Sequence, residues 1–249
     1  MKAIISDIHG NLEALQAVIA DCERQGVKDI YCLGDLVGYG PNPCECLDLA
    51  MKWKLILLGN FDQALSYNYD GFGVSAYRSM SWTHAQMETK RTLEAYRKFM
   101  TGLPRTHQEG DSLFVHGSAR NPLNEYVFPE DIYNQRKMDG IFPLFEKHCF
   151  QGHTHVPGVF TESLQDDSYH FQSPEEIDYI HKLDARKTMI NVGSVGQPRD
   201  GDWRACYALL DRDIVLFRRV EYDVDTTVKK IYGITDLDHF LGDRLRDGR

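Results

Sequence analysis

Short apolar runs alternate with amphipathic stretches over the first sixty residues of the chain. Residues 2–6, 29–33 and 54–58 have the composition of short buried strands. Helices are predicted between them, over 11–25 and 44–52, and the first has apolar residues at helical spacing: Leu12, Leu15, Val18 and Ile19. The order strand, helix, strand, helix, strand predicts a parallel sheet covered by helices.

The pattern changes after residue 60. Residues 61–103 open with aromatic side chains among glycine and asparagine and continue with two helical stretches, 74–87 and 90–100. We expect this segment to be a helical, lid-like insertion. Its aromatic residues are expected mainly to pack, with stacking on a nucleobase as the alternative: Tyr67, Tyr69 and Phe72.

The second half of the chain is rich in predicted strands. They lie at 112–115, 149–151, 158–162, 169–172, 188–192, 206–210 and 214–220. This pattern predicts a second sheet in the same core. The acid-rich stretch 165–187 is expected to be a surface excursion, and 223–247 reads as one or two amphipathic helices on the outside. We find no repeat or linker, and we expect a single domain over residues 1–249.

The charge of the chain limits the kinds of partner that it can bind, and its cysteine content indicates the redox compartment. The net charge of −9 gives no support for a stable nucleic acid partner or for binding to an anionic membrane, so a phosphate site needs positive charge from metal ions or a few arginines. The sequence shows no secretory signal pattern and no apolar run that could span a bilayer. The six cysteines form no CxxC pair, which favours reduced thiols in the cytoplasm, and we expect Cys44 and Cys46 to be surface thiols.

Polar residues able to bind metal follow the predicted strands. They are Asp7, His9, Asp35, Asn60, His116, His153 and His155. Because ligands bind outside the carboxyl ends of strands in open α/β sheets, we expect these seven side chains to converge. Imidazole, carboxylate and amide groups suit borderline divalent ions, and seven ligands are too many for one tetrahedral zinc. The set therefore predicts two divalent ions about 4 Å apart, with an anionic phosphate group as substrate.

Five short motifs in this order resemble the calcineurin-like metallophosphoesterase superfamily. They are Asp7-Ile8-His9, Gly34-Asp35-Leu36-Val37-Gly38, Gly59-Asn60-Phe61-Asp62, Val115-His116-Gly117 and Gly152-His153-Thr154-His155. Two further stretches, 38–41 and 191–199, resemble its small prokaryotic phosphodiesterase-like branch. The resemblance implies a four-layer αββα sandwich of the α/β (α+β) class, with two mixed sheets flanked by helices.

The resemblance also implies roles for the ligands. One ion is expected on Asp7, His9, Asp35 and His155, and the other on Asp35, Asn60, His116 and His153. Asp35 would bridge the ions, and a hydroxide between them would attack phosphorus in line. Asp35, Asn60 and His116 are thus the predicted catalytic residues. Manganese is the expected metal, with iron, zinc, nickel or cobalt as alternatives.

The sequence departs from the family pattern at Phe61, where many members have a histidine that protonates the leaving group. Phenylalanine has no proton to donate, and Asp62 lacks its usual partner. General acid catalysis typically contributes 10²–10⁴-fold, and its loss matters least for leaving groups that are weak bases. We therefore expect weak activity on alkyl monoesters such as phosphoserine and better activity on diesters or phosphoanhydrides.

Three further residues are candidates for substrate contact: Asn11, Arg120 and Arg199. Each has a structural alternative, a helix cap for Asn11 and a surface ion pair for either arginine. The predicted function is a dinuclear-metal phosphoesterase acting on a phosphodiester or nucleotide polyphosphate. The alternatives are a protein phosphatase or other phosphomonoesterase, and a metal-bound interaction scaffold without turnover.

Overall fold

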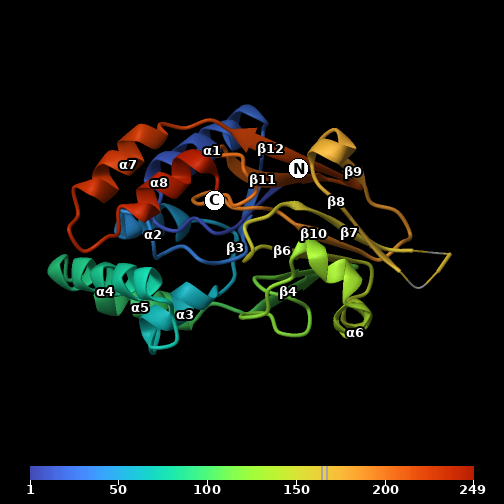
Figure 1. Cartoon of the computed structure of the whole chain (residues 1–249), viewed down its shortest axis with the longest axis horizontal. Coiled ribbons are helices and arrows are strands. Elements are labelled where there is room, and N and C mark those ends of the chain that lie inside the picture. The colour runs from blue at the N-terminus through green and yellow to red at the C-terminus, as the bar shows by residue number, and fades with distance from the viewer. Residues whose placement is uncertain (164, 167) are drawn as a thin grey trace.

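Two six-stranded mixed sheets pack face to face in the computed structural model, which describes residues 1–163, 165–166 and 168–249 (Figure 1). The first sheet has the order β3-β2-β1-β11-β12-β9 and the second β4-β5-β6-β10-β7-β8. The strands of the first are β1 (Lys2–Ile5), β2 (Asp29–Cys32), β3 (Leu55–Ile56), β9 (Ile180–Lys182), β11 (Ala205–Asp211) and β12 (Ile214–Val220). Those of the second are β4 (Thr106–Glu109), β5 (Ser112–Val115), β6 (His148–Gln151), β7 (Gly158–Glu162), β8 (Tyr169–Gln172) and β10 (Thr188–Asn191).

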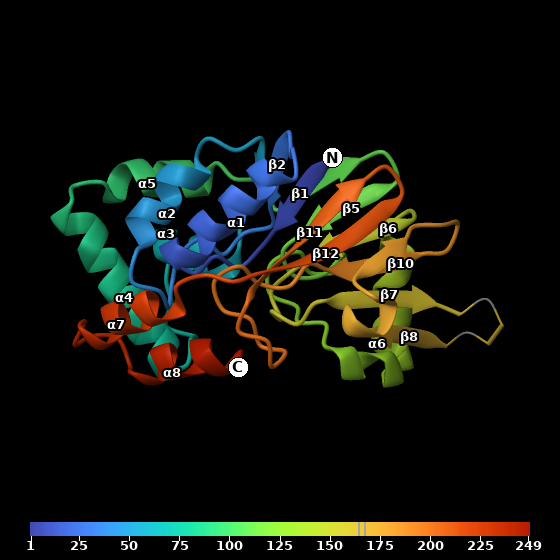
Figure 2. The ribbon, with the colours of Figure 1, turned by 90° about the horizontal axis from the view of Figure 1, so that it is seen from above.

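Helices cover the outer faces of both sheets. They are α1 (Leu12–Arg24), α2 (Pro43–Ala50), α3 (Asn60–Ser66), α4 (Val74–Thr89), α5 (Leu93–Thr101), α6 (Gln135–Asp139), α7 (Val224–Tyr232) and α8 (Phe240–Asp247). Three short 3₁₀ helices lie at Pro129–Tyr133, Phe142–Leu144 and Glu175–Ile177. Figures 1 and 2 show α3, α4, α5, α7 and α8 at one end of the molecule and α6 toward the other. The αββα prediction is confirmed.

The alternation of side chains along each strand builds three layers of core. In β1, Ile4 faces the second sheet, whereas Ala3 and Ile5 face α1 and α2. In β6, Phe150 faces the first sheet and Cys149 faces the α6 side. Because consecutive residues of a strand point to opposite faces, a strand of continuous apolar residues fits a sheet that is buried on both sides.

Several predictions from the sequence need correction. Cys44 and Cys46 are not surface thiols: they are 2% and 0% exposed because α2 turns them toward the core. The stretch 165–187 is not wholly a surface excursion, since β9 pairs with β12 and Leu183 is buried between the sheets. Residue 167 of that stretch lies outside the described residues. Helix α3 follows Gly59 directly, an element that the sequence pattern did not predict.

The other helices and strands that the sequence predicted lie close to their predicted positions. Helices α4 and α5 occupy the two helical stretches of 61–103, and α7 and α8 occupy the C-terminal segment. None of the helices in the described ranges combines the length and apolar character needed to cross a membrane.

Candidate metal centre

Strands from both sheets end at the same place and carry the predicted ligands there. Asp7 follows β1 and Asp35 follows β2, which are parallel neighbours in the first sheet. His116 follows β5 and His153 follows β6, which are parallel neighbours in the second. Parallel strands present their carboxyl ends at one edge, so the stacked sheets form a single site between their edges.

Six of the predicted ligands form two buried groups, in each of which the ligand atoms lie within 4.8 Å of one another: Asp7, His9 and His155, and Asp35, His116 and His153. In the first group, Asp7 Oδ1 lies 3.2 Å from His155 Nε2 and 3.8 Å from His9 Nε2. In the second, Asp35 Oδ2 lies 3.4 Å from His116 Nε2. These separations match side chains that face a shared central point.

The backbone at the site is strained. Five of the six ligands have left-handed φ angles: Asp7 (54°), His9 (47°), Asp35 (56°), His153 (67°) and His155 (62°). Residues other than glycine rarely adopt this conformation. Each instance costs about 1–3 kcal/mol of stability, so it persists only where the surrounding structure enforces it. The strain turns the chain sharply after each strand. Its concentration here is typical of a functional site.

Two glycines allow the ligand loops to approach one another. A Cβ atom on Gly59 would lie 2.1 Å from Asp35 Oδ1, and one on Gly152 would lie 2.5 Å from Asp7 Oδ2. Both separations are shorter than atoms tolerate. The structure thus explains why glycine precedes Asn60 and His153 in the two motifs.

Backbone carbonyls fix the orientation of three of the histidine rings. Each ring places Nδ1 at hydrogen-bond distance from a carbonyl oxygen: His9 to Val37 at 2.9 Å, His116 to Leu33 at 3.1 Å and His155 to Gln197 at 2.6 Å. A carbonyl only accepts, so Nδ1–H donates, and in the neutral ring that binds a metal the lone pair is on Nε2. This arrangement is the one that orients histidine ligands toward a metal.

Asp35 divides its two oxygens between structure and site. Its Oδ1 accepts a hydrogen bond of 2.9 Å from the backbone N–H of Phe61. Its Oδ2 lies 3.4 Å from His116 Nε2 and 3.7 Å from His9 Nε2, which belong to different ligand groups. One carboxylate oxygen therefore faces both groups.

Asp62 holds this arrangement in place, although it lacks the histidine usual at position 61. Its carboxylate accepts hydrogen bonds from the backbone N–H groups of Asp35 (2.8 Å), Leu36 (2.9 Å) and Gly59 (3.2 Å). Burial and the nearby Asp35 raise the pKa of Asp62 to about 7. Phe61 is buried, and its ring lies 5.0 Å from that of His9, edge to face.

The electrostatics of the site are those of buried, opposing charges. Burial lowers the pKa of His9 and of His153 to about 3. Burial also opposes protonation of His116, but the carboxylates of Asp35 and Asp7 outweigh it and raise its pKa to about 9. Burial similarly opposes ionisation of Asp7, and the nearby imidazoles, His155 foremost, still lower its pKa.

The donor set fits a divalent metal. Among the described residues, Asp7 Oδ1 and His153 Nε2 are buried without a hydrogen-bond partner. Such atoms are costly unless something satisfies them, and a cation would satisfy both. Imidazole nitrogen with carboxylate oxygen suits borderline divalent ions. Asn60, the seventh predicted ligand, begins α3 and places its Oδ1 3.1 Å from His116 Nε2, at the rim of the second group.

Two of the predicted substrate contacts have structural partners. Asn11 caps α1 through a 3.1 Å hydrogen bond from Ala14 N–H to its Oδ1, which confirms the cap. Its side chain also donates to the Gly196 carbonyl oxygen at 2.9 Å. Arg120 forms an ion pair with Glu125 at the surface. Their contact with substrate stays a prediction.

Arg199 lies beside the metal centre. Its Nη2 donates to Gln197 Oε1 at 2.8 Å, and its guanidinium lies 5.9 Å from the centre of the Tyr39 ring. Its Nε is buried without a partner among the described residues. Arg244 on α8 adds positive charge nearby, and burial together with Arg199 lowers its pKa to about 10. Within the described residues, no side-chain carboxylate pairs with either guanidinium.

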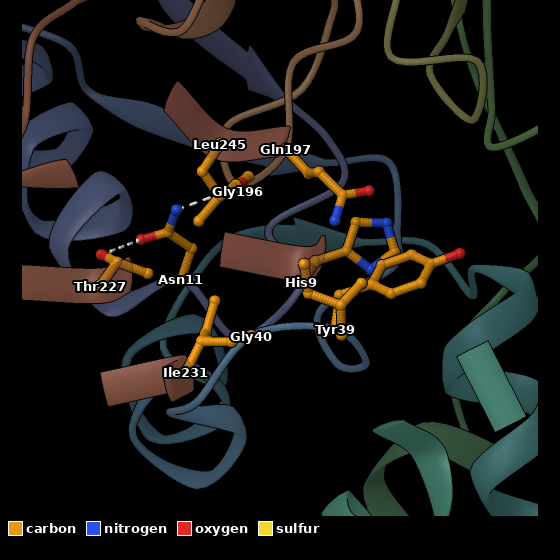
Figure 3. Close-up of a pocket in the computed structure, with 10 residues that line it drawn as sticks. His9, Asn11, Tyr39, Gly40, Gly196, Gln197, Thr227, Ile231 and Leu245 are labelled. Atoms are coloured by element: carbon orange, nitrogen blue, oxygen red, sulfur yellow. Dashed lines mark hydrogen bonds between the residues drawn. The ribbon is translucent and has the colours of Figure 1, made fainter. Parts of the chain in front are cut away.

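Residues that were not assigned from the sequence also surround the centre. Figure 3 shows Tyr39 and Gln197 beside His9, at one end of a small cavity of about 10 Å³ against α7 and α8. The ring of Tyr126 stacks on His153, with centroids 3.8 Å apart and planes at 18°. Tyr39 lies between two glycines in the stretch 38–41, which the sequence identifies by its resemblance to the family. Tyr126 has no comparable signal.

Fold and site together define an α/β protein with a buried divalent-metal centre at the carboxyl ends of its strands, and comparisons with known proteins agree. A family model described as calcineurin-like phosphoesterase matches residues 3–185. A protein of Methanocaldococcus jannaschii, itself uncharacterized, is 35% identical over 262 residues, covering 100% of this chain and 98% of that protein. The chain therefore belongs to the calcineurin-like phosphoesterase family and is a metallophosphoesterase, a hydrolase.

Solved structures show the same architecture. The crystal structure of a metallophosphoesterase from Sphaerobacter thermophilus is 36% identical, with a TM-score of 0.82 over 100% of this chain and 98% of that one. A hypothetical protein from Pyrococcus horikoshii is 20% identical and shares the fold, with a TM-score of 0.74 over 100% and 99% of the two chains.

Proposed function

We propose that this metallophosphoesterase uses two divalent ions to hydrolyse a phosphodiester or a nucleotide polyphosphate. The observation that carries the proposal is the position of Asp35 Oδ2 between two buried ligand groups, 3.4 Å from His116 Nε2 and 3.7 Å from His9 Nε2. A carboxylate shared between two groups is the arrangement expected of a two-metal centre. Manganese is the metal we propose first, because the set has imidazole and oxygen donors and contains no thiolate.

The seven ligands divide between the proposed ions as the motifs imply. Asp7, His9 and His155 would hold one ion, Asn60, His116 and His153 would hold the other, and Asp35 would be shared by both. When bound, the ions supply an activated water and neutralise charge on the phosphoryl oxygens. The carbonyl contacts of His9, His116 and His155 keep their Nε2 atoms aimed inward, so that these three ligands are already oriented before an ion binds.

Arg199 and Arg244 complete the anion site on the side of Tyr39. Arg199 has a buried Nε without a partner among the described residues, and a substrate phosphate would satisfy it. Arg120 is the weaker candidate for this contact because Glu125 already engages its guanidinium. The buried free thiols, of Cys32 and Cys46 for example, agree with a reducing compartment, and we place the protein in the cytoplasm.

Phe61 favours diesters and anhydrides over alkyl monoesters. Its ring lies 5.0 Å from that of His9, at the sequence position where the family resemblance implies a histidine that protonates the leaving group. Substrates whose leaving groups are weak bases need this help least. A protein phosphatase or another phosphomonoesterase remains the second candidate within the family.

The test combines metal analysis with a substrate panel. Purified protein is loaded with Mn²⁺, dialysed, analysed for metal and assayed with bis(p-nitrophenyl) phosphate, diadenosine polyphosphates, cyclic nucleotides and phosphoserine. Two ions per chain with faster hydrolysis of a diester or anhydride than of phosphoserine would support the proposal. Faster hydrolysis of phosphoserine would favour the phosphomonoesterase, and bound metal with no turnover would favour the interaction scaffold.

A further inference from the structure

Helix α3 connects the metal centre with a second feature of the molecule. Three of its residues and its C-cap residue recur at helical spacing on one side: Asn60, Gln63, Ala64 and Tyr67 are i, i+3, i+4 and i+7. The opposite side is buried, with Phe61 and Leu65 in the core. The helix therefore has a core face and an open face, and the open face begins at a predicted metal ligand.

This open face forms one wall of a pocket of about 400 Å³. The residues that define it are Asn60, Gln63, Tyr67, Tyr69, Phe72 and Asn124. Its size is within the range of small-molecule sites, about 300–1,000 Å³. Asn60 belongs both to this pocket and to the rim of the metal centre, so the pocket and the metal centre adjoin at this residue.

The chemistry of the pocket walls is aromatic and uncharged. Tyr67 is 74% exposed, so most of its ring is open to a ligand. Plain packing, predicted from the sequence for all three aromatics, is thus wrong for Tyr67. Phe72 stacks on Phe61, with centroids 4.6 Å apart and planes at 18°, and so has a fixed position.

The polar groups in the walls are neutral amides. Gln63 and Asn124 contribute amide groups from two separate segments, Gln63 from α3 and Asn124 from the segment that follows β5. Amides both donate and accept hydrogen bonds, as the edge of a heterocyclic base requires. No lysine or arginine lines this pocket within the described residues, so nothing there would bind a second phosphate.

We propose that this pocket binds the planar, uncharged aromatic group of the substrate, a nucleobase in the first instance, while its phosphate lies at the metal centre. The proposal rests on the proposed phosphoesterase function and specifies its substrate. Positive charge lies on the Tyr39 side of the centre and aromatic surface on the Asn60 side. A nucleotide ester matches this polarity, because it has an anionic end and an aromatic end.

Stacking sets the size of the expected effect. Base–aromatic stacking in open sites is worth roughly 5- to 150-fold in affinity per base. A nucleoside ester should therefore have a KM at least about 5-fold lower than a methyl ester with the same leaving group. The value of kcat should change little, because the pocket binds ground state and transition state alike.

The kinetic experiment compares adenosine 5′-(p-nitrophenyl) phosphate with methyl p-nitrophenyl phosphate on the full-length, Mn²⁺-loaded protein. The variant is Tyr67→Ala, and the control is Tyr133→Ala, which removes another exposed tyrosine (86% exposed) that does not line the pocket. We expect Tyr67→Ala to raise the KM of the adenosine ester at least about 5-fold and leave the methyl ester unchanged. The control should alter neither.

A binding experiment separates failure of the pocket from failure of the enzyme. Adenosine, which has no phosphate, is added to metal-free protein and its binding is followed by saturation-transfer NMR. Binding that Tyr67→Ala abolishes and Tyr133→Ala preserves would support the pocket, even if no ester were hydrolysed. Equal KM values for the two esters, or adenosine binding unaffected by Tyr67→Ala, would overturn the pocket while leaving the phosphoesterase function intact.

Discussion

A single methyl group at Gly59 should disable the metal centre without unfolding the chain. Gly59 has an ordinary φ of −88°, so alanine brings no backbone strain there. Its Cβ would, however, lie 2.1 Å from Asp35 Oδ1 and 2.2 Å from the backbone nitrogen of Asp35. Contacts below 3.0 Å are essentially never observed, so the carboxylate and the backbone of Asp35 have to move away from Gly59, by about 0.9 Å and about 0.8 Å.

This displacement is large on the scale of a catalytic site. Asp35 Oδ2 is the oxygen that faces both ligand groups, and a misplacement of about 1 Å can cost on the order of 10²-fold in rate. Overpacking of this kind typically costs 1–3 kcal/mol of stability. We therefore expect Gly59→Ala to fold, to melt at a lower temperature, and to lose about 10²-fold in kcat/KM together with part of its bound metal.

The assay measures kcat/KM on bis(p-nitrophenyl) phosphate at saturating Mn²⁺, metal content after dialysis, and thermal unfolding. The matched control is Gly102→Ala at the end of α5, where the nearest atom to the new Cβ is 3.4 Å away and the backbone is helical. The control should retain activity and both metals. Wild-type activity and metal content in Gly59→Ala would refute the role assigned to the position of Asp35.

Four other perturbations have expected outcomes. Asp35→Asn should lower both metal occupancy and activity, and an active variant with two ions would contradict the bridging role. Phe61→His should raise activity on phosphoserine relative to a nitrophenyl diester, by up to about 10²-fold if the new imidazole acts as a general acid. An unchanged ratio of the two activities would contradict the assignment of residue 61 as the place of the missing acid. Arg199→Ala should raise the KM for anionic substrates more than Arg120→Ala does. Equal increases in KM for the two variants would contradict the choice of Arg199 over Arg120 as the phosphate contact. Asp21→Asn should destabilise the fold by about 1.5–3 kcal/mol at pH 7, because it removes the charge from the partner of Arg218, whose side chain is 30% exposed. Burial opposes ionisation of Asp21, but the hydrogen bonds that it accepts from Arg218 and Tyr207 lower its pKa. The difference in unfolding free energy between wild type and Asp21→Asn should therefore be fully present above about pH 4 and should become smaller as the pH falls below that value.

Some elements were beyond the reach of sequence patterns for identifiable reasons. Helix α3 has seven residues, too few for a periodicity to emerge from the adjacent glycines and aromatics. Strand β4 lies at a sheet edge with mostly exposed side chains, so it lacks apolar alternation. Strand β9 has three residues, and only its pairing with β12 makes it part of a sheet.

The sequence by itself determined the architecture and the ligand types. Apolar strands followed by aspartate or histidine are local patterns, and the position of a ligand after a strand predicts where it must lie. The sequence also shows Phe61 in place of a proton donor, and this residue predicts substrates whose leaving groups need no proton from the protein.

Only the tertiary structure decided how those residues meet. Asp7 and His155 are far apart in the chain, and their 3.2 Å approach depends on the stacking of two sheets and on left-handed turns. The same holds for Asp62, whose three N–H partners come from two loops, and for the pocket beside Asn60. Distances between remote segments arise from packing of the whole chain, and no local pattern of residues contains them.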